Sequence, residues 1–103
     1  MTDHDLLAAQ LRAAAGGDAA LDAAVAGVFP QAAELSHVSG SVDECLSLLD
    51  QALPGWHWHV GKGANGVLPY ATLTKEQWRV TADGPTVPIA LLRAMLAAKQ
   101  ALR

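Results

Sequence analysis

The hydrophobic pattern of the chain changes from a helical period to a period of two at Pro54-Gly55. Before this point, the segment that begins at Ser41 carries apolar residues three and four apart, which predicts an amphipathic helix. After it, apolar and histidine residues alternate, which predicts a half-buried strand. Both patterns in one short chain indicate the α+β class. The strand is expected to turn Trp56, Trp58 and Val60 toward the core and His57 and His59 toward solvent.

Each predicted helix begins at a residue whose side-chain oxygen can accept a backbone N–H. The four predicted N-caps are Thr2, Asp18, Ser41 and Thr86. Glu44, three residues after Ser41, predicts a capping box there. Gly16-Gly17 and Pro30 end the first two helices, and residues 31–40 are expected to form a connection. The buried face of the last helix is expected to hold Leu91, Leu92, Met95, Leu96 and Ala98.

Two further alternating segments follow the first strand. Residues 67–73 predict its partner, with Pro69 indicating an edge or a bulge, and residues 78–82 predict a third strand. Short connections between consecutive strands favour antiparallel pairing. The sequence therefore predicts an α+β fold in which N-terminal helices and a C-terminal helix flank a three-stranded antiparallel sheet.

Composition is typical of one globular domain. The chain has 103 residues, of which 51% are hydrophobic and 17% charged, so it can build a single core. The net charge of −3 disfavours duplex nucleic acid as a partner, and no apolar run reaches the roughly 20 residues of a membrane span. Because Cys45 is the only cysteine and the N-terminus lacks the basic region of a secretory signal, the expected location is the cytoplasm.

Gly61, Gly63 and Gly66 have the spacing of a dinucleotide-binding loop. That loop needs a helix directly after it, because the helix N-terminus binds the pyrophosphate. Residues 67–73 alternate as a strand instead. The pattern therefore favours a hairpin turn containing Asn65-Gly66.

His57 and His59 share one face of a strand, a spacing that suits a divalent metal ion once a third ligand joins them. The candidates for that ligand are His4, His37, Asp43 and Glu76. The favoured alternative is a pair of solvent-facing polar residues opposite buried tryptophans. Cys45 lies on an apolar helical stripe and is expected to be a core residue, not a nucleophile. No catalytic residue, metal site or cofactor is predicted.

Most of the aromatic area lies in the predicted sheet, close in sequence to basic residues. An exposed aromatic ring beside Lys or Arg can stack a nucleobase and hold its phosphate. The predicted ligand-binding residues are Lys62, Tyr70, Lys75, Trp78 and Arg79. We expect a small nucleotide at this rim of the sheet or at a subunit interface.

Four short motifs follow one another along the chain in a defined order. They are Leu21-Asp22-Ala23-Ala24, Ser41-Val42-Asp43, Leu53-Pro54-Gly55-Trp56 and Ile89-Ala90-Leu91-Leu92. Together they resemble the phage ABA-sandwich domain family of small phage and prophage proteins, over most of the chain. The resemblance implies an α-β-α layered fold. It implies no established activity, because such proteins are mostly of unknown function, but it suggests binding to host immune nucleotides or defence proteins.

Three hypotheses follow. The first is a phage-encoded, non-enzymatic, cytoplasmic counter-defence protein that sequesters a nucleotide-type immune signal of the host and forms a homo-oligomer. The second is a protein-interaction module that inhibits a host defence enzyme through an exposed helix face. The third is a metal-dependent enzyme that uses His57 and His59.

Overall fold

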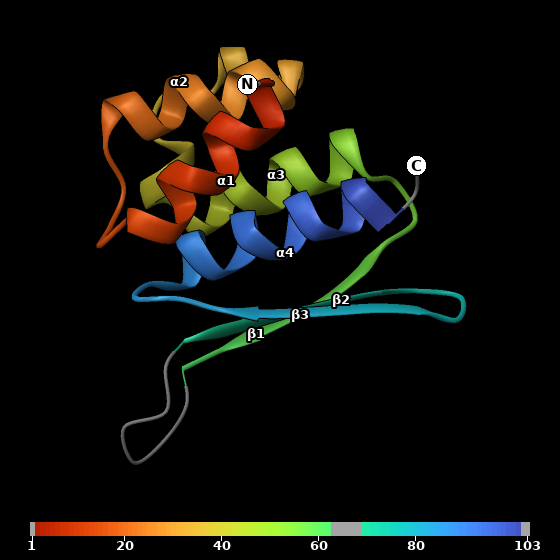
Figure 1. The fold of residues 1–103 in the computed structure, drawn as a ribbon. Coiled ribbons are helices and arrows are strands. Elements are labelled where there is room, and N and C mark those ends of the chain that lie inside the picture. Colours follow the sequence, from red (N-terminus) through yellow and green to blue (C-terminus); the bar gives the residue numbers. More distant parts are fainter. Residues whose placement is uncertain (1, 63–68, 102–103) are drawn as a thin grey trace.

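The computed structural model describes residues 2–62 and 69–101, which form helices and one antiparallel sheet (Figure 1). The elements in chain order are α1 (Asp3–Ala13), α2 (Ala19–Val28), η1 (Pro30–Glu34), η2 (Val38–Gly40), α3 (Val42–Ala52), β1 (His57–Gly61), β2 (Tyr70–Lys75), β3 (Trp78–Asp83) and α4 (Val87–Ala101). The η elements are short 3-10 helices that span most of the connection expected at residues 31–40, and the first of them begins one residue earlier, at Pro30.

The predicted N-caps are confirmed by hydrogen bonds from backbone N–H groups three residues later. Thr2 accepts from Asp5, Asp18 from Leu21, Ser41 from Glu44, and Thr86 from Ile89. Thr2 and Asp5 form a complete capping box. At Ser41 only half of the predicted box is present, because the Glu44 carboxylate accepts from the N–H of His37 at 3.0 Å. That bond stabilises the entry into α3 from the preceding turn.

The strands pair in the order β1-β2-β3, with all pairs antiparallel. The register aligns Trp58, Leu73 and Val80 in one row on the side of the sheet that faces the helices. The next row on that side holds Val60, Ala71 and Ala82. Leu73 and Ala71, on the central strand, are fully buried.

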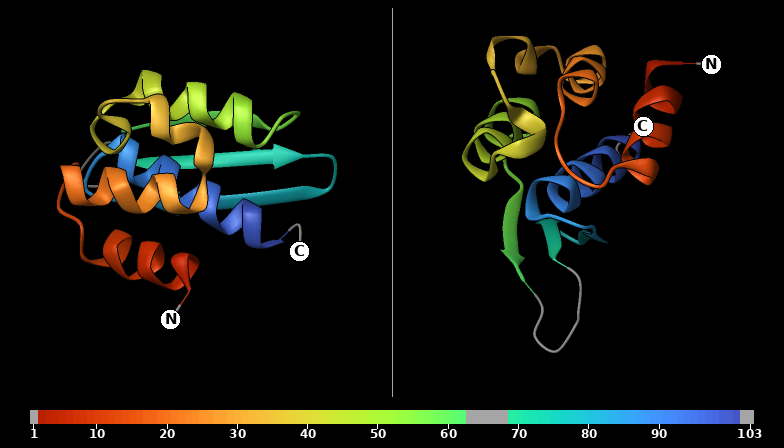
Figure 2. Two further views of the ribbon diagram at one scale, coloured as in Figure 1. Left: turned by 90° about the horizontal axis from the view of Figure 1, so that it is seen from above. Right: turned by 90° about the vertical axis from the view of Figure 1, so that its left-hand side faces the viewer.

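All described helices lie on the same side of the sheet (Figures 1 and 2). Helix α4 packs directly on β2 and β3, and α1 and α3 pack against α4. The predicted class, the three antiparallel strands, the N-terminal helices and the C-terminal helix are confirmed. The layer order differs from an α-β-α sandwich, since it runs from outer helices through α4 to the sheet. No described helix covers the opposite face of the sheet, which carries the exposed His57 and His59.

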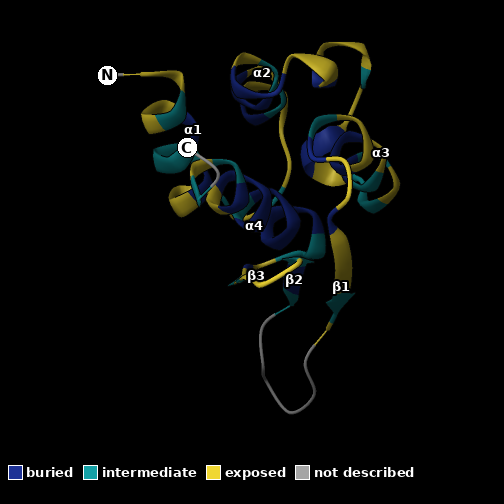
Figure 3. Cartoon of the chain, turned by 90° about the vertical axis from the view of Figure 1, so that its right-hand side faces the viewer, coloured by how far each residue is buried: buried dark blue, intermediate teal, exposed yellow. Residues whose placement is uncertain are grey.

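Helix α4 forms the centre of the core (Figure 3). The predicted buried face is confirmed, since all five residues expected there are buried, and Ile89, Ala90 and Ala94 are buried as well. A helix surrounded by apolar contacts needs hydrophobic residues on nearly every side, which explains the continuous apolar run near its start. Over the described ranges, no helix has both the length and the apolarity needed to cross a membrane.

Candidate functional site

The three tryptophans differ in exposure. Trp56 is 7% exposed, whereas Trp58 is 50% exposed and Trp78 is 42% exposed. The expectation that Trp56 belongs to the core is confirmed, and the same expectation for Trp58 is wrong. Trp58 lies on an edge strand, and α4 packs mainly on the other two strands, so its indole is only half covered.

Trp58, Lys75 and Trp78 are neighbours in the strand ladder, and the surface to which they contribute is here called the tryptophan surface. Lys75 lies directly opposite Trp78 across the ladder of β2 and β3. Trp58 is a diagonal neighbour of Lys75, because its own partner is Leu73, two residues earlier on β2. Direct cross-strand pairs have Cβ atoms roughly 5 Å apart, and diagonal pairs are within reach of long side chains. All three side chains lie on the helix-facing side of the sheet.

Lys75 places a positive charge next to the start of β1. Its Nζ donates to the Pro54 carbonyl at 3.4 Å. Between Pro54 and Trp56, Gly55 has φ +88°, and a Cβ there would lie 3.4 Å from the Cε of Lys75. Gly55 is therefore required for the backbone conformation, and it leaves room for the Lys75 side chain.

A groove of about 320 Å³ lies between α3 and β1, next to Trp58. This volume is at the lower end of the range for small-molecule sites. The lining residues are Leu46, Ser47, Leu49, Asp50, Trp56 and Trp58. The α3 residues were absent from the sequence prediction. Leu46 and Asp50 are one helical turn apart, beside the apolar stripe of α3, and that spacing is the signal that could have found them.

The indole N–H of Trp56 is buried and has no hydrogen-bond partner within the described part of the chain. A buried donor without a partner costs roughly 1–3 kcal/mol. Because the nitrogen itself has almost no solvent-accessible surface, the donor is enclosed beside the groove that Trp56 lines.

The structure separates the other predicted binding residues from the tryptophan surface. Tyr70 is at the far end of β2 from Lys75, about 17 Å away along the strand. Lys62 is exposed at that same far end, directly after β1. Arg79 is exposed and faces the opposite side of the sheet from Trp78, in register with Thr74. The five predicted residues therefore do not form one site, because Lys75 and Trp78 lie together at one end of the sheet and Lys62 and Tyr70 lie at the other.

His57 and His59 are exposed on the uncovered face of the sheet, as expected. The Nε2 of His59 lies 2.9 Å from the hydroxyl of Tyr70, and the two rings are 5.7 Å apart. Among the residues that the structure describes, no three His, Cys, Asp or Glu side chains are grouped so that they could hold a metal ion. Gly63 and Gly66 of the glycine motif, with the turn predicted around them, lie outside the described residues.

Cys45 is completely buried, which confirms its prediction as a core residue. Its thiol donates to the Val38 carbonyl, with Sγ and O 2.9 Å apart. Burial raises the pKa of Cys45 to about 12, with smaller contributions from the charges of Glu44 and Asp22. A thiol that stays protonated at neutral pH is a poor nucleophile.

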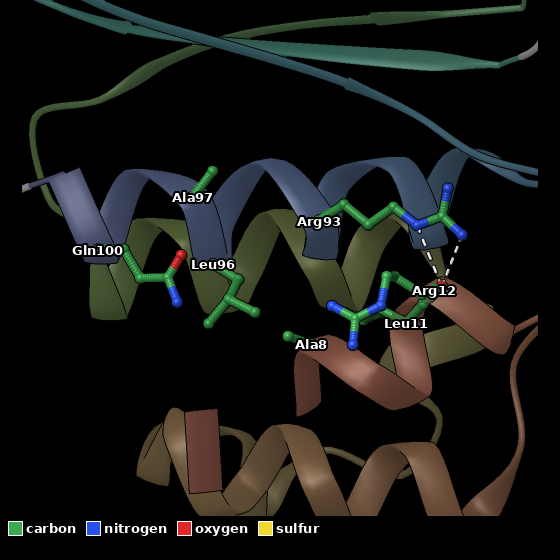
Figure 4. Close-up of a pocket in the computed structure, with 7 residues that line it drawn as sticks. All are labelled: Ala8, Leu11, Arg12, Arg93, Leu96, Ala97 and Gln100. Carbon is green, nitrogen blue, oxygen red and sulfur yellow. Dashed lines mark hydrogen bonds between the residues drawn. The ribbon is translucent and has the colours of Figure 1, made fainter. Parts of the chain in front are cut away.

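Two other pockets are lined by polar side chains that stabilise the fold. A pocket of about 150 Å³ between α1 and α4 is lined in part by Arg12 and Arg93 (Figure 4). There the Arg93 guanidinium donates to the Leu11 carbonyl and joins the two helices. A larger polar cleft lies at the start of α2 and α3. Its carboxylates cap α2 or bind neighbouring backbone and hydroxyl groups through Asp18, Asp22 and Glu44.

Comparison with protein-family models, with curated proteins and with solved structures finds no match to this chain.

Proposed function

We propose that this chain is a non-enzymatic protein that binds a nucleotide-type ligand on the tryptophan surface and in the adjoining groove. The observation that carries the proposal is the exposure of Trp58 and Trp78, at 50% and 42%. Full burial of a large apolar side chain contributes roughly 1.5–3 kcal/mol, and part of that is forgone here. A planar ligand that stacks on an indole recovers it.

The residues around the groove suit the parts of a nucleotide. An aromatic base stacks on the exposed indole of Trp58, as bases do on aromatic platforms. The Asp50 carboxylate, in the groove wall, accepts hydrogen bonds from base amino groups. Lys75, on the neighbouring strand, attracts the phosphate.

The resemblance to phage ABA-sandwich domain proteins supports a place for this binding in counter-defence. A small protein that sequesters a nucleotide signal of host immunity needs affinity and abundance, not catalysis. It acts in the host cytoplasm, where such signals are present. This part of the proposal depends on the resemblance alone.

Differential scanning fluorimetry with a panel of mononucleotides, linear oligonucleotides and cyclic nucleotides tests the proposal. A ligand at about 100 times its dissociation constant stabilises the folded protein by about 2.7 kcal/mol, so the melting temperature should rise by roughly 10 °C or more. Trp58→Ala should weaken binding by the roughly 1–3 kcal/mol of one stacked base. Lys75→Met should weaken it for phosphorylated ligands only. Arg12→Met, which changes an exposed side chain on α1, is the matched charge control.

A panel without any stabilising member contradicts the proposal. The exposed indoles also favour a second candidate, a host defence protein as partner, because Trp is frequent at the energetic centre of protein interfaces. Pull-down from host lysate with wild type and with Trp58→Ala separates the two candidates. A stoichiometric protein lost in the variant favours the second.

A further inference from the structure

Among the strands that the structure describes, β3 (Trp78–Asp83) is an edge strand of the sheet. The strand order ends with it, and Figure 3 shows it on the side away from β1. An unpaired edge presents a row of N–H and C=O groups that can pair with another strand. The backbone groups that point outward from this edge, and the side chains beside them, determine which kind of strand can pair with it.

The hydrogen-bond phase of β3 follows from one bond just beyond it. Gly84 N–H donates to the Pro69 carbonyl at 3.0 Å, and the ladder register places these two residues directly opposite each other. Backbone groups alternate between the two sides of an antiparallel strand. Gly84, Ala82 and Val80 therefore direct their backbone groups to β2. The residues that direct theirs to the free edge are Arg79, Thr81 and Asp83.

These three residues are exposed, and their side chains share the uncovered face of the sheet. Arg79 carries a positive charge, Thr81 a neutral hydroxyl and Asp83 a negative charge. The two charged residues lie at equal distances along the strand on either side of Thr81. When such a strand pairs antiparallel with a copy of itself centred on Thr81, Arg79 of each copy lies opposite Asp83 of the other. Opposite charges in direct cross-strand positions stabilise pairing, and so do Thr–Thr pairs.

We propose that β3 pairs with β3 of a second copy about a two-fold axis at Thr81, which gives a six-stranded antiparallel sheet. An interface of this kind is isologous, so each contact occurs twice. The Asp83 carbonyl already accepts from Arg93 Nη1 at 2.9 Å, and its second lone pair takes the N–H of the second copy. This inference does not depend on a bound ligand.

The helix-facing side of β3 supports the same pairing. Val80 and Ala82 are only partly buried, whereas Ala71 and Leu73, their partners on β2, have no exposed surface. A strand added beyond β3 covers these apolar side chains. The other edge, β1, lacks this symmetry, because its residues from His57 to Gly61 include no pair of opposite charges. The charges therefore select β3 as the edge that pairs with itself.

Sedimentation velocity of the full chain over a wide concentration range tests the interface. Wild type should give a reversible dimer. Arg79→Asp and Asp83→Arg each place like charges opposite each other at two points, and each should weaken dimerisation roughly tenfold or more. The double variant R79D/D83R restores opposite charges and should dimerise like wild type. Glu34→Arg, an exposed charge reversal on η1, is the matched control and should leave the dimer unchanged.

Mixing the two single variants gives the sharpest result. The variant R79D carries acidic residues at both positions, and D83R carries basic residues at both. The mixture should therefore form heterodimers, although each variant alone dimerises weakly. A wild-type chain that is monomeric at every concentration overturns the proposal. A dimer that survives both single reversals also overturns it, because another surface must then hold the copies together.

Discussion

Asp22 accepts both the hydroxyl and the backbone N–H of Ser39 through the same oxygen, Oδ1, at 2.5 and 2.8 Å. Ser39 is 1% exposed and lies 17 residues away in the chain. Its hydroxyl oxygen also accepts from the Asp18 N–H at 3.1 Å. Through these bonds the start of α2 holds η2 and the entry to α3 in place, with the polar groups of Ser39 satisfied inside the core.

Asp22→Ala should destabilise the protein by about 1–3 kcal/mol, because it leaves the buried N–H of Ser39 without its acceptor and the hydroxyl with only the Asp18 carbonyl, 3.1 Å away. Ser39→Ala should cost less, since it removes the hydroxyl together with its need for a partner. Chemical denaturation measures both values. Asp50→Ala, an exposed carboxylate on α3, serves as control, and equal losses for Asp22→Ala and Asp50→Ala would disprove the assigned role.

Gly17→Ala should destabilise the fold by roughly 1–3 kcal/mol through overpacking. A Cβ at Gly17 would lie 2.6 Å from the backbone N of Gly40 and the carbonyl O of Ser39, and neither backbone atom can move freely. The neighbouring Gly16 is a built-in control, because a Cβ there meets nothing within 4 Å. Gly16→Ala should be neutral in thermal denaturation, and a melting temperature equally lowered in both variants would contradict this account.

Arg93→Met should cost about 1.5–3 kcal/mol, the usual range for hydrogen bonds from a charged group. The guanidinium donates to the Leu11 carbonyl through Nε at 3.1 Å and Nη2 at 2.6 Å, and to the Asp83 carbonyl through Nη1 at 2.9 Å. It thus joins α1, α4 and the end of β3. Arg12→Met, in the same pocket but exposed, should change the free energy of unfolding little (Figure 4).

Alkaline pH should weaken the fold through Cys45. Its pKa is about 12 when buried and 9.0 in its ordinary state, so the unfolded chain loses this proton first as pH rises. The stability that the protonated thiol contributes is complete below pH 9 and declines by about 1.4 kcal/mol per pH unit as the pH rises toward the folded pKa. Cys45→Ala lacks the titration, so the stability gap between wild type and variant should narrow from pH 9 to 12. A constant gap would show that the thiol does not titrate differently on unfolding.

The helix boundaries and strand order could be predicted because their causes are local. Each N-cap side chain accepts from the backbone N–H three residues on, as seen for Thr2, Asp18, Ser41 and Thr86. The residue that predicts each helix start therefore also makes the capping hydrogen bond. The alternation on β1 likewise assigned Trp58 to the correct side of the sheet. Its exposure could not be read from sequence, because that depends on which strands α4 covers.

The candidate site was only partly predictable for the same reason. Lys75 and Trp78 flank a tight turn, so their proximity is local and was expected. Tyr70 and Lys75 begin and end one strand, and an extended strand keeps its ends apart, a signal that was present in the sequence. The contribution of Leu46 and Asp50 depends on how α3 lies against β1, which the sequence alone does not specify.

The placement of every described helix on one side of the sheet has an evolutionary consequence. The side chains of the opposite face contribute little to the core. Substitutions on that face should therefore change the free energy of unfolding of the single chain little, at His57, His59, Thr72, Thr74 and Thr81. Such a face can diversify rapidly while the helical side stays constant. A library randomised at these five positions should retain folded members at high frequency, which makes the face a natural place for new specificities to arise.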